Sequence, residues 1–325
     1  MRSATETVER HTMSHRSARR PFAGAAALLL AAATLPGTAA AVAAAVPTCF
    51  GLVPTILGTN GADVLVGTSS ADVIVGLGGD DEIIGGGGAD VLCGNAGDDD
   101  LFGEGGNDRL HGGADDDVLV GGGTADWLYG GSGNDSLFGG PGSDRYDGGG
   151  GGADYVGFID APGPVRADLR SGSASGEGSD TIKYVEGLIG SPFGDTLYGD
   201  SRVNRLIGAG GDDTLHGRGE SDFVLFLYAT GGIDLDLQAE QSTGEGTDTV
   251  LRIENAYGSP HDDTLEGTTE PNYLDGAEGT DTIDGRGGGD ACNGEVVSNC
   301  EEEAGTGADA GALIATRGIQ TAAGR

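Results

Sequence analysis

The chain has 325 residues, of which 66 are glycine, and its 52 acidic against 17 basic side chains give a formal net charge of −35. This charge argues against nucleic acid or an anionic membrane surface as a partner, because both are negatively charged and would repel the chain. The many glycines and the scarcity of large apolar residues argue against the core of an ordinary globular protein of this length.

The first 45 residues have the composition of an export signal. Three arginines between positions 16 and 20 are followed by an apolar run rich in alanine and leucine, and then by small residues. This order predicts a signal peptide over residues 1–45, cleaved after Ala45 or after Ala41. Arg19 and Arg20 resemble a twin-arginine signal, so the general and the twin-arginine export routes both stay open. The apolar run is short, so we expect a secreted, extracellular protein without membrane insertion.

A short leading segment at 46–57 precedes a series of nine-residue units over residues 58–154, the last of which is irregular. In each regular unit a glycine stands five places before an aspartate and an apolar residue stands two places after it. The aspartates in phase are Asp63, Asp72, Asp81, Asp90, Asp99, Asp108, Asp117, Asp126, Asp135 and Asp144. Ten units in phase indicate a repeat architecture rather than a disordered acidic chain. Glycine at this frequency excludes helices, so we expect short strands separated by turns.

Two segments of similar sequence follow, at 155–222 and 223–300. Residues 165–199 align with residues 233–267 without a gap, at an offset of 68 positions. Each segment begins with a spacer that we expect to form strands and ends with four nonapeptides. The sixth places of these units carry Asp195, Asn204, Asp213 and Asp222, and then Asp263, Asn272, Asp281 and Asp290. The remaining residues, 301–325, are small and polar, and we predict that they are disordered.

The order of residues within a unit predicts a turn followed by a short strand. Glycines permit the positive φ angles of a tight turn, and the apolar side chain of the strand points inward. Two units complete one coil, and the coils stack into two parallel sheets with strands about 4.8 Å apart. Stacking brings the aspartates of successive coils together, which costs free energy unless a cation lies between them. Calcium suits such a site because it takes six to eight oxygen ligands, including backbone carbonyls, in a loose geometry.

These units resemble the RTX, or haemolysin-type, calcium-binding repeat. The resemblance implies an all-β fold, a parallel β-roll or β-solenoid of GGxGxDxUx nonapeptides, in which the sixth-place aspartate and loop carbonyls bind several Ca2+ ions. It predicts as metal ligands Asp63, Asp72, Asp81, Asp90, Asp99, Asp108, Asp117, Asp126, Asp135, Asp144, Asp195, Asp213, Asp222, Asp263, Asp281 and Asp290. The units GTSSAD (67–72), GDSRVN (199–204) and GTTEPN (267–272) lose turn glycines, so we expect weak or absent sites there.

Four cysteines in an exported chain predict two disulfides. Of the three possible pairings we favour Cys49 with Cys93 and Cys292 with Cys300. The first would tie the leading segment to the fourth unit, and the second would close the last unit. A metal site is the alternative, but neither a CxxC pair nor a nearby histidine supports it.

The sequence favours a secreted calcium-binding structural or interaction module whose repeats fold when Ca2+ binds. The motifs HExxH and GxSxG do not occur, and no block of about 100 residues is left over for a catalytic domain. We therefore expect no enzyme and no catalytic residues. The alternatives are a calcium-dependent extracellular enzyme with a site in the spacers at 155–194 or 223–262, and a cell-surface adhesin.

Overall fold

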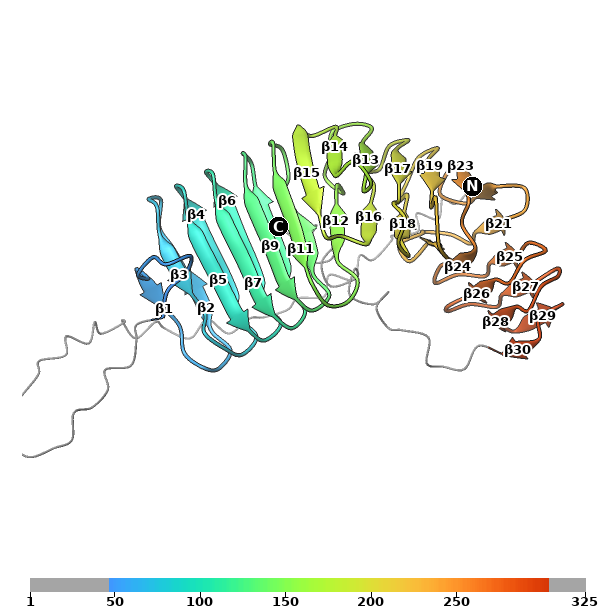
Figure 1. The fold of residues 1–325 in the computed structure, drawn as a ribbon, viewed down its shortest axis with the longest axis horizontal. Helices are drawn as coiled ribbons and strands as arrows, with labels where there is room; N and C mark the ends of the chain where they lie inside the picture. The colour runs from blue at the N-terminus through green and yellow to red at the C-terminus, as the bar shows by residue number, and fades with distance from the viewer. Residues whose placement is uncertain (1–46, 304–325) are drawn as a thin grey trace, which may run out of the picture. The chain divides into compact units, whose positions relative to one another are not determined.

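The computed structural model describes residues 47–303, which contain strands and no helix (Figure 1). The predicted signal peptide lies outside the described residues, as do residues 304–325 of the predicted tail. The strands form two sheets, one of 13 strands and one of 17. Residues 47–303 therefore offer no helical segment that could cross a membrane.

The strands are short, because glycine-rich turns recur about every nine residues along the series. The 13-stranded sheet consists of β2 (Val64–Val66), β4 (Glu82–Gly87), β6 (Asp100–Gly105), β8 (Val118–Gly122), β10 (Ser136–Phe138), β12 (Tyr155–Gly157), β16 (Gly187–Ile189), β18 (Arg205–Ile207), β20 (Phe223–Leu225), β24 (Asn255–Tyr257), β26 (Tyr273–Asp275), β28 (Ala291–Asn293) and β30 (Glu302–Glu303). The 17-stranded sheet consists of β1 (Ile56–Leu57), β3 (Val73–Val75), β5 (Val91–Ala96), β7 (Arg109–Ala114), β9 (Trp127–Ser132), β11 (Arg145–Gly149), β13 (Arg166–Asp168), β14 (Ser173–Ser175), β15 (Ser179–Lys183), β17 (Thr196–Tyr198), β19 (Thr214–His216), β21 (Asp234–Asp236), β22 (Gln241–Thr243), β23 (Thr247–Leu251), β25 (Thr264–Glu266), β27 (Thr282–Asp284) and β29 (Val296–Ser298).

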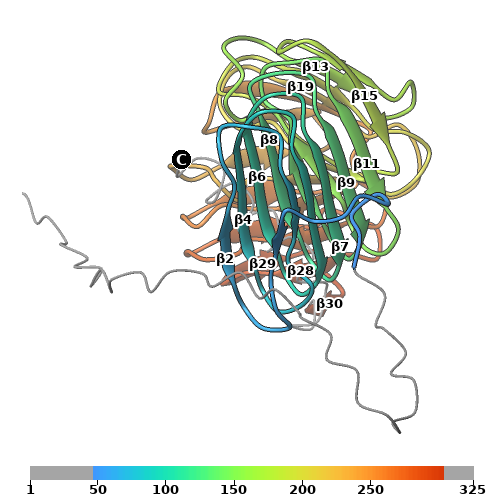
Figure 2. The ribbon, with the colours of Figure 1, turned by 90° about the vertical axis from the view of Figure 1, so that its left-hand side faces the viewer.

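Successive nonapeptides alternate between the two sheets, so that units 18 residues apart are neighbours in one sheet. Leu92 of β5 lies opposite Leu110 of β7, and Leu110 lies opposite Leu128 of β9, all in parallel pairs. Figure 2 shows β4, β6 and β8 side by side in one sheet, and β7, β9 and β11 in the other. These leucines are fully buried in one continuous hydrophobic core. The parallel β-roll predicted from the nine-residue period is confirmed.

The spacers add antiparallel strands to this parallel arrangement. β13, β14 and β15 form an antiparallel meander, in which Ala174 lies opposite Ala167 on one side and Asp180 on the other. β15 also pairs in parallel with β11, and β13 pairs in parallel with β17. The meander is therefore inserted into the sheet without interrupting it. β21, β22 and β23 form the same arrangement between β19 and β25.

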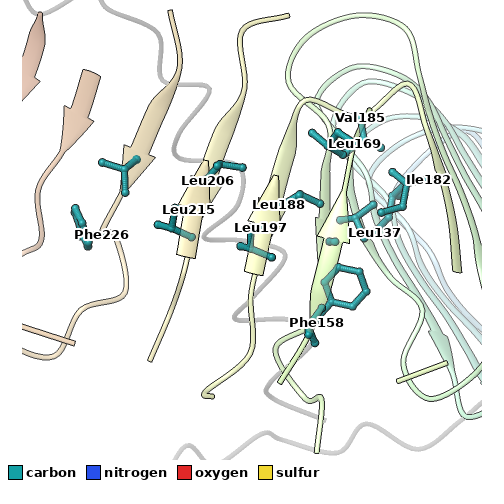
Figure 3. Close-up of a cluster of buried hydrophobic side chains, with 14 of the residues drawn as sticks. Leu137, Phe158, Leu169, Ile182, Val185, Leu188, Leu197, Leu206, Leu215 and Phe226 are labelled. Atoms are coloured by element: carbon teal, nitrogen blue, oxygen red, sulfur yellow. The ribbon is translucent and has the colours of Figure 1, made fainter. Parts of the chain in front are cut away.

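Larger apolar side chains fill the core where the first series meets the first spacer. The ring of Phe158 packs edge-on against the ring of Tyr146, with centroids 6.3 Å apart. Figure 3 shows Phe158 in this region together with Leu137 and Ile182 from neighbouring strands. The same core continues past the spacer through the next column of leucines, for example Leu206.

The predicted disulfide pairing is confirmed. Cys49 is bonded to Cys93 on β5, and Cys292 on β28 is bonded to Cys300. Cys49 and Cys93 belong to a small hydrophobic cluster separate from the main core, so the leading segment covers the outer side of this sheet. Cys292 instead takes an inward place, in register with Leu274 of the preceding unit.

The predicted boundary of the C-terminal tail needs one correction. β30 pairs in parallel with β28, so residues 302–303 continue the roll instead of starting the tail at 301. The backbone N–H of Glu301 also donates a hydrogen bond to the carbonyl of Asp290, at 3.0 Å. This order comes from backbone pairing with β28, which the small, polar composition does not reveal.

Candidate metal centre

The sixth-place aspartates form two ladders, one along each sheet. In each step the backbone N–H of one aspartate donates to Oδ1 of the aspartate 18 residues further on. The N–H of Asp90 donates to Asp108 at 2.7 Å, and the N–H of Asp108 donates to Asp126 at 2.8 Å. Asp108 and Asp126 are almost completely buried. The nine-residue period therefore places a carboxylate at the same point of every coil, with one oxygen fixed by the backbone.

Carboxylates outside the predicted ligand set continue the ladders across the spacers and beyond the last series. Their side chains accept the N–H of the last aspartate of a series, or of the irregular unit that follows it. The pairs, donor first, are Asp135 with Asp154, Asp154 with Glu186, Asp144 with Asp180, Asp213 with Asp248, Asp222 with Glu254 and Asp281 with Glu295. The sequence does hold a signal for two of them, since GEGSD (176–180) and GEGTD (244–248) keep the G-x-G-x-D part of a nonapeptide.

The second oxygen of most predicted ligands has no hydrogen-bond partner. These Oδ2 atoms are buried and accept no hydrogen bond from any described residue, which is rare for a charged group in a protein interior. They belong to Asp81, Asp90, Asp108, Asp117, Asp126, Asp135, Asp144, Asp213, Asp222, Asp281 and Asp290. A buried carboxylate oxygen in this situation requires either a proton or a cation. This chemistry fits a hard cation that binds oxygen.

Backbone carbonyl oxygens face the same spaces as these carboxylates. A methyl group placed on Gly85 would lie 2.6 Å from Oδ2 of Asp90 and 3.0 Å from the carbonyl oxygen of Gly103. The first place of the unit must therefore be glycine, because a side chain there would collide with both oxygens. The same glycine leaves a carboxylate oxygen and a carbonyl oxygen of adjacent coils facing each other, and both are calcium ligands.

Carboxylate side chains alone do not complete such a site. Among residues 47–303, no three His, Cys, Asp or Glu side chains converge closely enough to hold a metal ion between them. A cation between two coils would therefore depend on loop carbonyls as well as on aspartates. Calcium accepts this mixture, whereas zinc prefers histidine and cysteine.

Burial raises the pKa of the aspartates in the middle of the ladders. The pKa of Asp117 rises to about 9, and the pKa values of Asp135 and Asp213 rise to about 8. Burial is the largest cause, neighbouring carboxylates add to it, and the backbone N–H bond to each carboxylate opposes it. At neutral pH these carboxyls hold protons unless a cation balances their charge.

Four predicted ligands have a different environment, because a hydroxyl and a backbone N–H from their own turn bind the carboxylate. In the second unit, the N–H and the hydroxyl of Thr68 both lie 2.8 Å from Oδ2 of Asp72. These bonds lower the pKa of Asp72, with the hydroxyl as the largest cause. The four pairs are Asp63 with Thr59, Asp72 with Thr68, Asp195 with Ser191, and Asp263 with Ser259.

The two asparagines at sixth places are held by hydrogen bonds of the same kind. Oδ1 of Asn272 accepts the N–H of Thr268 at 2.6 Å, and its Nδ2 donates to the carbonyl of Glu254 at 2.6 Å. Oδ1 of Asn204 accepts the N–H of Asp200 at 2.7 Å. An amide brings no negative charge, so these two units need no cation to balance a buried carboxylate.

Comparison with known proteins agrees with this geometry. The family model of the RTX calcium-binding nonapeptide repeat, which spans four copies of the repeat, matches residues 57–92, 94–128, 120–153, 189–224 and 257–291. Together these matches cover about half of the chain. No curated protein matches it. The matched segments contain the three nonapeptide series and leave out most of the two spacers, and the chain therefore belongs to the RTX calcium-binding repeat family.

Proposed function

We propose that this protein is a secreted module in which calcium binding drives folding of the β-roll. One observation carries the proposal: the second oxygens of the central aspartates are buried and accept no hydrogen bond. Without a metal, each coil adds carboxylates that must be protonated or must repel one another. Calcium supplies the positive charge that balances them.

The residues that would hold the ions are the aspartates with such an oxygen, together with the carbonyls of adjacent turns. In each of these units Oδ1 of the aspartate accepts a backbone N–H, and Oδ2 points toward the space bordered by the carbonyl of the next coil, as at Asp90 and Gly103. One ion would thus join two coils. Sites joined in this way are expected to fill cooperatively, because each filled site orders the coil on which the next one depends.

Folding would require the metal because the small hydrophobic core stabilises the folded state too little to offset the conformational entropy that the chain loses. The buried core is narrow, since most coils of the nonapeptide series contribute one inward apolar side chain from each sheet, usually leucine or isoleucine. Ordering a chain with 66 glycines costs conformational entropy that such a core offsets poorly. Extracellular calcium modules bind at about 10⁻⁴–10⁻³ M, so the chain would stay largely unfolded where calcium is scarce and fold after export.

Two disulfides and the acidic surface support an extracellular location, because disulfides form and persist in oxidising compartments. We assign the module a structural or interaction role rather than a catalytic one. The buried carboxylates are already accounted for by the ladders, and no catalytic motif supplements them.

A calcium titration of the mature protein, followed by far-ultraviolet circular dichroism, tests this function. Strand signal should rise steeply at millimolar calcium and fall when a chelator is added, and magnesium should have a much smaller effect because it prefers a tight octahedral site. The disulfides should preserve some structure in chelator. A full strand spectrum that persists in excess chelator would refute the proposal.

A further inference from the structure

The second residue of each unit occurs in two backbone conformations. In the units whose aspartate has a buried oxygen without a partner, this residue has a positive φ. It is often not glycine, as at Leu77 (φ 89°), Ala209 (φ 65°), Arg218 (φ 88°) and Ala277 (φ 70°). A positive φ is unfavourable for a non-glycine residue, so these turns maintain an unfavourable backbone conformation around the aspartate.

Six units lack this conformation, and in all six the second residue donates its backbone N–H to the sixth-place side chain. None of these second residues has a positive φ. They are Thr59, Thr68, Ser191, Asp200, Ser259 and Thr268. A threonine or serine hydroxyl adds a second bond in five of the units. The arrangement resembles a helix N-cap, where a short polar side chain satisfies backbone N–H groups of its own turn.

The residue types explain the choice of conformation. Threonine is β-branched and avoids positive φ. Ser191 and Ser259 each precede a proline, which restricts the preceding residue to extended conformations. The residues at the same place in the positive-φ units carry no hydroxyl, and where a proline follows one of them, after Gly140, the residue is glycine, which tolerates a φ of 80°. The residue type at this single position thus distinguishes five of the six units, and in the sixth the second residue is Asp200.

The six units are not scattered along the chain. They form three consecutive pairs, at residues 58–75, 190–207 and 258–275, and each pair opens one nonapeptide series. The strand of the first unit lies in one sheet and the strand of the second lies in the other, as for β2 and β3. Each pair therefore forms one complete coil at the start of its series.

We infer that these three coils are metal-free and fold without calcium, and that the calcium sites are confined to the units that follow them. The inference rests on the proposed function and narrows it, because Asp63, Asp72, Asp195 and Asp263 then leave the set of metal ligands. In all four, Oδ2 accepts the backbone N–H of the second residue, a hydrogen bond that the following units lack. Each coil provides an ordered surface on which the next, calcium-dependent coil assembles.

Two matched pairs of variants test the inference by counting bound calcium with native mass spectrometry at saturating calcium. Ala277→Thr converts GAEGTD to GTEGTD, which has the pattern of the first unit, GTNGAD. Ala277→Gly keeps the positive φ and is the control. Ala209→Thr and Ala209→Gly make the same comparison in the nonapeptide series of the segment 155–222. Each threonine variant should bind at least one calcium ion fewer than wild type, and each glycine variant should bind the wild-type number.

The outcomes separate the two proposals. A wild-type protein that binds no calcium would overturn the proposed function itself. Calcium binding by wild type with an unchanged count in both threonine variants would overturn this inference alone. Hydrogen exchange of the wild-type protein in chelator gives an independent measurement that needs no variant. Backbone amides of 58–75, 190–207 and 258–275 should stay protected while the following units exchange, and uniform loss of protection would contradict the inference.

Discussion

Replacing Asp117 by asparagine should change the stability of the roll in opposite directions with and without calcium. Asp117 is completely buried, and its pKa rises from 3.8 to about 9. At about pH 7.5 the folded, metal-free chain keeps a proton on this carboxyl that the unfolded chain has lost. Each pH unit between the unfolded pKa and the working pH costs about 1.4 kcal/mol, so the penalty is on the order of 5 kcal/mol.

Asparagine removes this penalty because it is neutral and nearly isosteric. Its Oδ1 can still accept the N–H of Asp99, which Asp117 accepts at 2.9 Å. In chelator, Asp117→Asn should therefore increase the strand signal and raise the urea midpoint. In calcium it should lower both, because the ion loses a charged ligand.

The assay is urea unfolding followed by circular dichroism, in chelator and in about 5 mM calcium, which exceeds the dissociation constants typical of extracellular sites. Asp72→Asn is the control. The pKa of Asp72 is lowered by the hydroxyl and N–H of Thr68, so this variant should gain no stability in chelator. If Asp117→Asn shifts the midpoint in the same direction under both conditions, buried negative charge is not what calcium balances.

Three further predictions follow from the same geometry. In chelator, the folded pKa values of Asp108 (about 6) and Asp117 (about 9) exceed the unfolded value of 3.8, so the folded state binds more protons than the unfolded state. The strand signal should therefore fall as the pH rises from about 5 to 9, and a signal that grows with pH would contradict this. Asp108→Ala should reduce the number of bound calcium ions in native mass spectrometry, whereas Asn272→Ala should leave it unchanged, and equal losses would show that the assignment of ligands is wrong. Leu119→Ala, at a fully buried inward place, should lower the free energy of unfolding in calcium by about 2 to 5 kcal/mol, and a loss below about 1 kcal/mol in denaturant titration would mean that this column is not tightly packed.

The repeat period accounts for how much of the fold could be predicted from the sequence. A nine-residue period with one apolar place per unit leaves few alternatives to stacked short strands, and it also places Cys292 inward and Cys93, next to the inward Leu92, outward. The antiparallel meander of β13 to β15 could not be predicted in the same way. Its pairing joins β11 to β17 across residues that belong to no nonapeptide, and no short-range pattern encodes such contacts.

The candidate site was predictable in composition but not in detail. The period identifies which aspartates share a ladder, yet it assigns the same role to Asp72 and Asp90. The structure separates them, because Thr68 donates two hydrogen bonds to Asp72, and the equivalent residue of the other unit, Gly86, has a positive φ of 99°. Glu186 and Glu254 were missed because they join the ladders from spacer loops, at distances along the chain that no repeat period specifies.

The short strands at both ends of the roll have a consequence for its solubility. A stack of identical coils presents the same unpaired backbone groups at each end, and such edges can recruit a second copy and grow into a fibre. Here the terminal strands β1 and β30 contain two residues each, and β2 and β29 contain three. The disulfide between Cys49 and Cys93 fastens the leading segment beside one end, and the disulfide between Cys292 and Cys300 fastens the other. Short terminal strands beside disulfides present few unpaired backbone groups to a second copy, which disfavours end-to-end growth into a fibre.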